Sequence, residues 1–240
     1  DPFTIFSAMQ IRPDNVMLLM VVAGFLALEH GLRSKNTKYY FGSGVFFGLA
    51  VITIIKSIPL VFVTSAIFCI WALAKKQREN LAAYLLGLFV PPAVFLLIYA
   101  FLGELAPMIR GVFLDPLVLF QSLLFKTSLD FFYQPDNVLI YGAPGKALSW
   151  YYAIWLPYVA FLGVGCCLWD MWKKKRVHVL AAILMVGFGL SWLILYKSPV
   201  VFIQYFLSVN WLMALFAGVA LAFMYRYKLL AGAGSILFLF

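Results

Sequence analysis

Long apolar runs alternate with short polar segments along most of this chain. Seven runs are complete, at residues 15–32, 40–55, 57–74, 82–103, 150–171, 177–196 and 199–225, and an eighth occupies 229–240. A helix needs about 20 residues to cross the hydrocarbon core of a bilayer, which is roughly 30 Å thick. The pattern therefore predicts an all-α fold, a polytopic transmembrane bundle of about eight spans that forms one domain over residues 1–240.

The two ends of the chain add one expectation. The eighth run is still apolar at Phe240, and the first residue is Asp1. From 229 to 240 a helix is only about 18 Å long, which is too short to cross a bilayer. We therefore expect the chain to be a fragment of a longer protein.

Composition agrees with a membrane protein. Hydrophobic residues make up 65% of the chain and charged residues 11%, and the mean hydropathy is +0.99. Soluble domains are about half apolar, so an ordinary soluble domain is excluded. The net charge is +9, but the basic residues are scattered in short segments beside the apolar runs. This scatter indicates membrane orientation and argues against a nucleic-acid partner.

The distribution of basic residues predicts which side of the membrane each segment faces. Cytoplasmic loops are enriched in Lys and Arg. Alternating the spans puts twelve of the eighteen basic residues on one side: Arg33, Lys35, Lys38, Lys75, Lys76, Arg78, Lys173, Lys174, Lys175, Arg176, Arg226 and Lys228. Residues 1–14, the turn at Lys56, the segment 104–149 and the turn at Lys197 fall on the other side. We expect those segments to be non-cytoplasmic.

The same alternation requires the stretch 40–74 to be two helices. A single helix of that length would be about 52 Å long and would contain Pro59 in its interior. Residues 56–59 are therefore predicted to form a tight turn on the non-cytoplasmic side.

The segment 104–149 is too long for a simple connection. Its apolar stretches 107–114 and 117–132 carry isolated charges, among them Arg110 and Lys126. This composition is typical of helices that lie in the membrane interface. Two interpretations of these two cations stay open: they anchor the segment at the lipid headgroups, or they contact a bound substrate.

Charged residues gather at three points of the predicted outer side. Arg12 and Asp14 precede the first span, Lys56 interrupts an apolar stretch, and Lys197 follows the sixth span. Charges at membrane depth are costly and usually functional. Three cations and one carboxylate at comparable depth predict a pocket for an anionic headgroup such as phosphate. The simpler interpretation is that Asp14 or Asn15 caps a helix and Lys56 marks a helix end.

Two further features favour structural roles. Gly44 and Gly48 are spaced like a small-xxx-small pair, and we expect a packing face there rather than a dimer contact. Cys69, Cys166 and Cys167 lie in apolar runs without metal-ligand spacing and are predicted to be buried and inert.

Several short motifs carry a resemblance to a known family. They are Arg12-Pro13-Asp14 at the start of a span, the stretch 41–57 with Gly48-Leu49-Ala50 and Lys56, and the later segments 196–199, 204–207 and 217–218. Together they resemble the middle of C-type (GT-C) glycosyltransferases of the family 39 kind, related to protein O-mannosyltransferases and bacterial lipid A aminoarabinose transferases. The resemblance covers residues 10–225.

The resemblance implies a transferase that takes a sugar from a polyprenyl-phosphate carrier and passes it to a lipid, glycan or protein acceptor outside the cytoplasm. It implies that Asp14 supports catalysis, by orienting the acceptor, by holding a divalent metal where one is used, or by supporting the base. The principal base would precede the first residue. Lys56 and Lys197 would contact the carrier phosphate, assisted by Arg12.

The downstream motif has its own implication and its own departures. Gln204 and Tyr205 would belong to the substrate site, with Arg110 and Lys126 of the outer segment. The chain departs from the family pattern in having residues 200–203 before Gln204, and Asn210 where a proline is frequent.

Three other functions remain open at this stage. A lipid-linked saccharide transporter or flippase would also need outer cations, but it should contain discontinuous helices and polar residues at mid-membrane, for which Gln204 and Asn210 are the candidates. A surface polysaccharide polymerase or ligase would share the lipid-phosphate site. A structural membrane protein would need none of these outer charges.

Overall fold

The computed structural model describes residues 13–54, 57–115, 156–175, 177–197 and 207–226, and these residues form helices without any strand. The α-helices are α2 (Pro13–Ser34), α3 (Thr37–Thr53), α4 (Ile58–Ala74), α5 (Arg78–Phe101), α6 (Leu105–Ile109), α11 (Leu156–Lys174), α12 (Val179–Lys197) and α13 (Leu207–Arg226), and the π-helical segment η2 (Arg110–Leu114) follows α6. The all-α prediction is confirmed for these residues. The eighth apolar run, 229–240, lies outside them.

Two of the described helices are long and apolar enough to cross a membrane. They are α2, with 22 residues, and α5, with 24. The helix α4 and the apolar parts of α12 and α13 are shorter. The expected number of about eight spans therefore stays a prediction.

The division of 40–74 into two helices is confirmed. The helix α3 ends at Thr53 and α4 begins at Ile58. Ser57 closes the connection, because its backbone N–H and its hydroxyl both donate to the carbonyl oxygen of Ile54, at 3.1 and 3.0 Å. Pro59 lies in the first turn of α4, where its missing N–H costs nothing.

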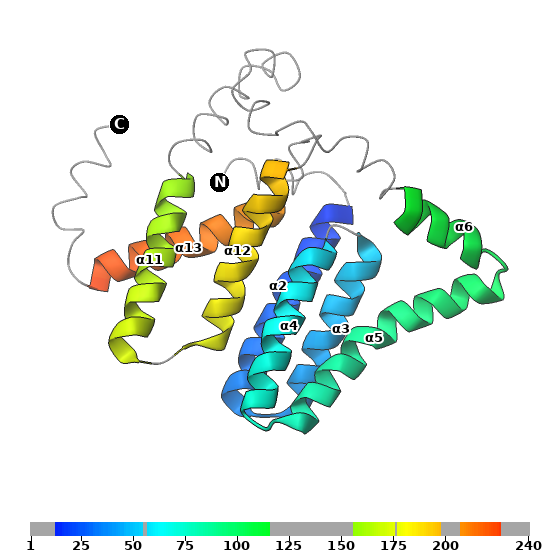
Figure 1. Ribbon diagram of the computed structural model, residues 1–240, viewed down its shortest axis with the longest axis horizontal. Coiled ribbons are helices and arrows are strands. Elements are labelled where there is room, and N and C mark those ends of the chain that lie inside the picture. Colours follow the sequence, from blue (N-terminus) through cyan, green and yellow to red (C-terminus); the bar gives the residue numbers. More distant parts are fainter. Residues whose placement is uncertain (1–12, 55–56, 116–155, 176, 198–206, 227–240) are drawn as a thin grey trace, which may run out of the picture.

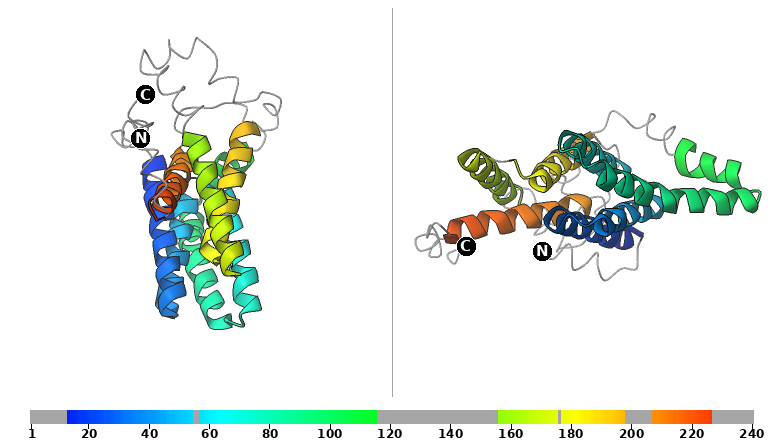
Figure 2. Two further views of the ribbon diagram at one scale, coloured as in Figure 1. Left: turned by 90° about the vertical axis from the view of Figure 1, so that its left-hand side faces the viewer. Right: turned by 90° about the horizontal axis from the view of Figure 1, so that it is seen from below.

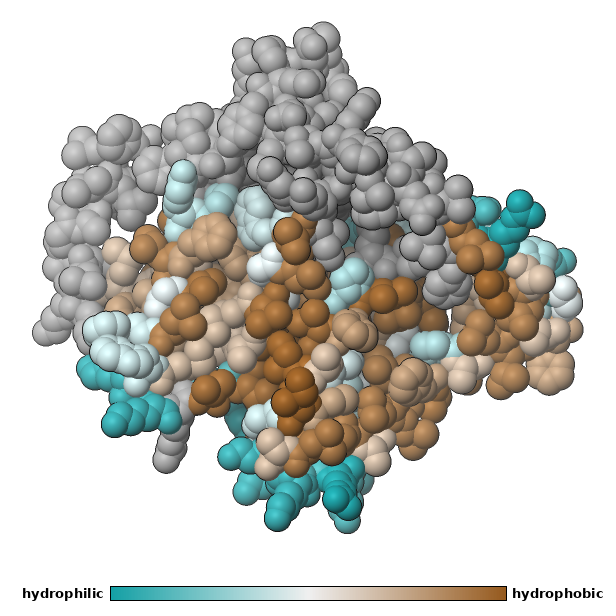
Figure 3. Space-filling view, in the orientation of Figure 1, coloured by the Kyte–Doolittle hydropathy of each residue, from teal (hydrophilic) through white to brown (hydrophobic). Residues whose placement is uncertain are grey.

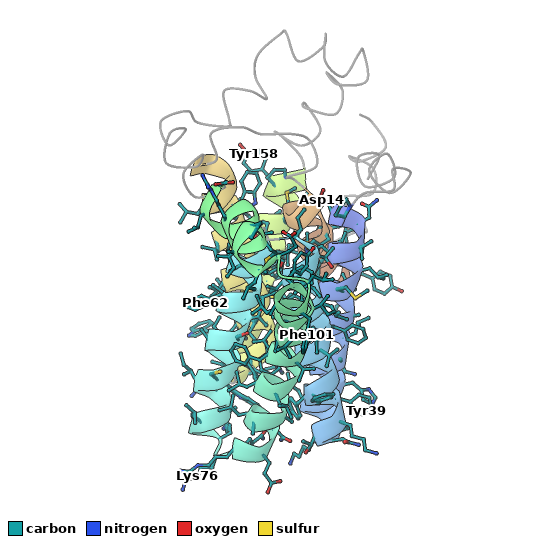
Figure 4. All side chains as sticks on the ribbon, turned by 90° about the vertical axis from the view of Figure 1, so that its right-hand side faces the viewer. Asp14, Tyr39, Phe62, Lys76, Phe101 and Tyr158 are labelled. Carbon is teal, nitrogen blue, oxygen red and sulfur yellow. The ribbon has the colours of Figure 1, made fainter. Side chains whose placement is uncertain are left out.

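The helix α3 runs antiparallel to α2 and to α4 (Figure 1). The bundle that they form has two ends. One end holds the helix termini at Pro13, Thr53 and Ile58, and we call it the Asp14 end. The other holds the connections 35–36 and 75–77, and we call it the Lys76 end. Asp14 and Lys76 mark these opposite ends in Figure 4. The helices α11 and α12 share the arrangement, with Leu156 and Lys197 at the Asp14 end.

Aromatic side chains fill the centre of a first group of helices, which consists of α2, α3, α4 and α5. Tyr40, Phe47, Phe68 and Tyr84 are fully buried, and Phe25 stands edge-on to Phe47 with ring centroids 5.1 Å apart. The tilted rings of Phe68 and Tyr84 have centroids 4.8 Å apart. Helices α2, α3, α4 and α5 therefore share one apolar core.

Close backbone contact joins α3 to α5, as the spacing of Gly44 and Gly48 predicts. A Cβ on Gly44 would collide with the carbonyl oxygen of Tyr84, and one on Gly87 would collide with the carbonyl oxygen of Phe41. Because a Cβ at either position would force the backbones apart, only glycine allows this approach. The packing-face interpretation is confirmed.

The helix α5 leaves the other helices in its second half. Pro91 and Pro92 lie inside it, and the buried residues of the helix, Tyr84 and Gly87, both precede them. Beyond the prolines α5 continues outward, and α6 with η2 turns back beside its end (Figures 1 and 2). Phe101, at the tip, is 89% exposed.

The helices α11 and α13 form a second group. Gly163 of α11 meets the backbone of Phe216 of α13 so closely that a Cβ on the glycine would collide with the Phe216 carbonyl oxygen. The helix α12 joins this group to the first, because Gly187 packs against the side chain of Leu60 on α4. Figure 3 shows hydrophobic side chains over much of the visible face and hydrophilic ones along the Lys76 end.

Candidate functional site

Asp14 is the best-defined residue of the candidate site. The helix α2 begins at Pro13, two residues before the predicted start, so Asp14 and Asn15 lie inside the first turn rather than at a capping position. Proline is favoured at the first helical position because its φ is already helical. Asp14 is 8% exposed, and its carboxylate lies near the positive end of the helix dipole. The fold therefore keeps an acidic group buried at one end of the bundle.

The residues that flank Lys56 lie at nearly the same level as Asp14. The hydroxyl of Ser43 donates to the carbonyl oxygen of Gly24 at 2.9 Å, which fixes the register of α2 against α3. From that bond Asp14 is about 15 Å away along α2, and Ile54 is about 16 Å away along α3. Lys56 itself, with residue 55, lies outside the described residues. The residues on either side of this pair, Ile54 and Ser57, are joined by hydrogen bonds and lie at about the level of Asp14.

The end of α12 reaches farther out than this turn. Measured from the contact between Gly187 and Leu60, Lys197 is about 15 Å along α12, whereas Ser57 is about 5 Å along α4. The backbone of Lys197 therefore ends about 10 Å beyond the start of α4. Figure 1 shows the same extension of α12. The side chain of Lys197 lies outside the described residues.

Arg110 is engaged away from Asp14. Its Nε lies 3.6 Å from Oδ1 of Asp115, and both side chains are largely exposed. The π-helical turn explains the pair, because residues five apart are neighbours on a π-helix. Within the described residues η2 continues α6 directly, and α6 contacts α5. The structure therefore puts Asp14 level with the residues that flank Lys56, whereas Arg110 lies beside the outer end of α5.

Arg12, Lys126, Gln204 and Tyr205 all lie outside the described residues. The helix α13 includes the backbone of Asn210, but not a described side chain.

Trp192 is a candidate that the sequence analysis missed. Its indole nitrogen is buried and has no hydrogen-bond partner in the part of the chain that the structure describes. Buried indole N–H groups usually find an acceptor, so an unpartnered one calls for an explanation. Trp192 lies about 7.5 Å beyond Gly187 along α12, near the level of Ser57. No motif in the sequence indicates a role for Trp192, because a tryptophan in an apolar run is normally predicted to be a core residue.

A groove between α11 and α13 is a second feature that the sequence analysis missed. Its lining on α11 follows the helical period through Tyr158, Phe161, Leu162, Trp169 and Lys173. Aromatic residues at this spacing, ending in a lysine, were the available signal.

The described residues contain neither a metal-ligand cluster nor a disulfide. No cluster of three or more His, Cys, Asp or Glu side chains there is arranged to hold a metal ion. Cys69, Cys166 and Cys167 are free thiols, half-buried rather than fully buried as predicted.

Comparisons of the chain with protein-family models, with curated proteins and with solved structures found no match.

Proposed function

We propose that this chain carries the lipid-phosphate site of a multi-pass membrane glycosyltransferase, which moves a sugar from a polyprenyl-phosphate carrier to an acceptor on the non-cytoplasmic side. The observation that carries the proposal is the buried carboxylate of Asp14 at the level of the turn that contains Lys56. Asp14 and the residues at the C-terminal end of the stretch 41–57, which belong to the motifs of the family resemblance, lie at this end of the bundle.

The surface of the described helices supports a membrane environment. Large apolar side chains that point outward, such as Phe62 at 70% exposure and Ile70 at 69%, would be unfavourable in water over such an area. Lys35, Lys75, Lys76 and Lys175 border the Lys76 end, where α2, α4 and α11 end. Under the positive-inside rule that end faces the cytoplasm and the Asp14 end faces outward.

The chemistry suits these residues. The acceptor oxygen or nitrogen attacks the anomeric carbon of the sugar, the bond from that carbon to the phosphate oxygen breaks, and the acceptor proton passes to a base. The phosphate gains charge as it leaves, and a lysine ammonium at Lys56 would stabilise that charge. Asp14 would orient the acceptor or assist the base.

Binding of a polyprenyl phosphate to the full-length protein in nanodiscs tests the site. Lys56→Ala is expected to weaken binding about tenfold or more, as for loss of a charged hydrogen bond. Lys197→Ala is expected to weaken it less, because α12 ends about 10 Å farther out. The matched control is Lys75→Ala at the opposite end. Unchanged binding in both Lys56→Ala and Lys197→Ala, or an equal loss in Lys75→Ala, would contradict the proposed site.

Transfer is tested separately from binding. Release of polyprenyl phosphate from a sugar-loaded carrier should fall at least tenfold in Asp14→Asn while carrier binding persists. A lipid-linked saccharide transporter would instead leave the carrier intact in the wild type and in the variant. That result would support the transporter and overturn the transferase.

A further inference from the structure

A groove of about 980 Å³ runs along α11 beside α13. Tyr158, Phe161, Leu162 and Trp169 of α11 and Phe223 of α13 give it an apolar wall. Gly165 also lines it, and a Cβ on this glycine would meet no atom within 4 Å. The groove is thus open space beside a helix that is held tightly to α13 at Gly163.

One end of the groove is basic. Lys173 lines it there. A smaller hollow of about 280 Å³ shares Cys166 and Phe223 with the groove, and Arg226 lines that hollow together with His178 and Asp170. Asp170 accepts a 2.7 Å hydrogen bond from Lys174, and the segment 171–178 adds Lys175 and Arg176 but no further acid. Among the described residues at this end, the cations Lys173, Lys174, Lys175 and Arg226 outnumber the acid Asp170, and this charge suits an anionic ligand.

The groove has the length of one membrane leaflet. Trp169 and Trp172, 51% and 72% exposed, lie beside Lys173, and exposed tryptophans next to lysines mark a membrane interface. From Lys173 to Phe161 the helix rises about 18 Å. Half of a hydrocarbon core is about 15 Å thick. A chain that enters at the lysine would therefore reach the middle of the bilayer.

We propose that this groove binds an anionic phospholipid of the cytoplasmic leaflet. The headgroup phosphate lies at the end lined by Lys173, next to the smaller hollow that Arg226 lines, and one acyl chain follows the apolar wall toward Phe161. Basic hollows between membrane helices on the cytoplasmic side suit such headgroups. The site rests on the membrane topology proposed above and is independent of the transfer reaction.

Native mass spectrometry of the full-length protein tests the site, with phosphatidylglycerol and phosphatidylcholine supplied in equal amounts. Gly165→Leu fills the groove, and Gly189→Leu is its control, because Gly189 has equally open surroundings on α12 and lines neither hollow. Lys173→Gln removes a headgroup contact, and Lys75→Gln, an exposed lysine of the α4–α5 connection, is its control. Circular dichroism confirms that each variant is folded.

We expect the wild type to retain phosphatidylglycerol in preference to phosphatidylcholine. Lys173→Gln should lower this preference about fivefold, the effect of one basic residue near an anionic surface. Gly165→Leu should remove most of the adduct of both lipids, whereas the two controls should not differ from the wild type. Equal retention of the two lipids by the wild type would overturn the proposal. So would an unchanged adduct in both groove variants, or a loss of dimer mass instead of lipid in Gly165→Leu, which would mark the groove as a protein interface.

Discussion

Gly42 and Gly44 lie two residues apart on α3 and have opposite surroundings. A Cβ on Gly44 would collide with the backbone of α5, whereas one on Gly42 would meet no atom within 4 Å. Gly44→Ala should therefore lower the free energy of unfolding by about 1–3 kcal/mol, the usual cost of overpacking. Gly42→Ala should be neutral or stabilising by up to about 1 kcal/mol, since alanine is the better helix former. Denaturant titration of both variants in detergent measures the difference.

The two outcomes separate local propensity from packing. Equal effects of Gly42→Ala and Gly44→Ala would mean that helix propensity alone decides at both positions, and that the close approach of α3 and α5 is absent. The sequence spacing predicted a packing face at Gly44 and Gly48. It did not predict the partner glycine, Gly87, because spacing within one helix carries no information about which helix faces it.

Removing either partner of the hydrogen bond between Ser65 and Tyr84 should lower the free energy of unfolding by a different amount. The two hydroxyl oxygens are 2.8 Å apart, and the Ser65 hydroxyl also bonds the carbonyl oxygen of Val61 at 2.7 Å. Tyr84→Phe leaves Ser65 with its second partner, so the loss should be about 0.5–1.5 kcal/mol. Ser65→Ala leaves the buried tyrosine hydroxyl unpaired and should cost more, about 1–3 kcal/mol. Thermal unfolding compares the two variants, and a larger loss in Tyr84→Phe would contradict the assignment.

At the scale of the helices, three connections at the Lys76 end share an unusual feature. Lys35, Lys76 and Lys175 adopt positive φ values of 56°, 56° and 49°. Glycine is the usual residue at such helix ends, because a Cβ disfavours the left-handed conformation. The chain instead keeps a positive charge at all three places, which is consistent with a role for these lysines in orientation.

Replacing one of these lysines by glycine should stabilise the helix end. Gln77 donates its N–H to the carbonyl oxygen of Ala72 across the turn, so Lys76 occupies the left-handed position of a Schellman motif. Lys76→Gly should raise the free energy of unfolding by about 1 kcal/mol, whereas Lys76→Ala keeps the Cβ and should not. Lys75→Gly is the control, because φ of Lys75 is −89° and gains nothing from glycine. A gain in Lys76→Ala equal to that in Lys76→Gly would show that charge, not backbone strain, is relieved.

Helix positions were more predictable than helix paths. Apolar length and the lysine at 56 predicted the ends of α3 and α4 to within a few residues, because a charge and a following proline interrupt a span. The same reasoning could not predict that α5 leaves the bundle after Pro91, since that depends on how the glycines of α3 hold only its first half. The reasoning from sequence also could not predict the pairing of Arg110 with Asp115. That pair requires a π-helical turn, and no residue pattern indicates one there.

For the whole molecule, the proposed topology predicts the accessibility of single cysteines in a variant whose three native cysteines are replaced by alanine. Lys76→Cys and Lys175→Cys should react with an impermeant maleimide only when the cytoplasmic side is opened. Pro13→Cys should react in intact cells, because it lies at the opposite end of the bundle. Labelling of Pro13→Cys and Lys76→Cys from one side would contradict the proposed alternation of α2, α3 and α4 across the membrane.

The relative level of two parts of the candidate site was predictable, whereas the role of its residues stays a prediction. Charge alternation placed Asp14 and Lys56 on one side, and the fold puts Asp14 level with the residues that flank Lys56. The prediction of similar depth does not extend to the end of α12, because depth follows from the register of Gly187 against Leu60, which sequence alone does not reveal. Trp192 and the groove beside α11 were missed for the same reason: each arises from contact between helices far apart in the sequence.

The contact between Leu60 and Gly187 also sets an order of events during synthesis. A ribosome adds roughly 5–20 residues per second, so Leu60 is made about 6–25 s before its partner. During that interval α4 has its hydroxyls already satisfied, since Thr64 donates to the carbonyl oxygen of Leu60 and Ser65 to that of Val61. Under the proposed topology its apolar face is meanwhile covered by lipid or by the insertion machinery. A slow codon between the two helices would lengthen this exposure without altering any residue of the finished protein.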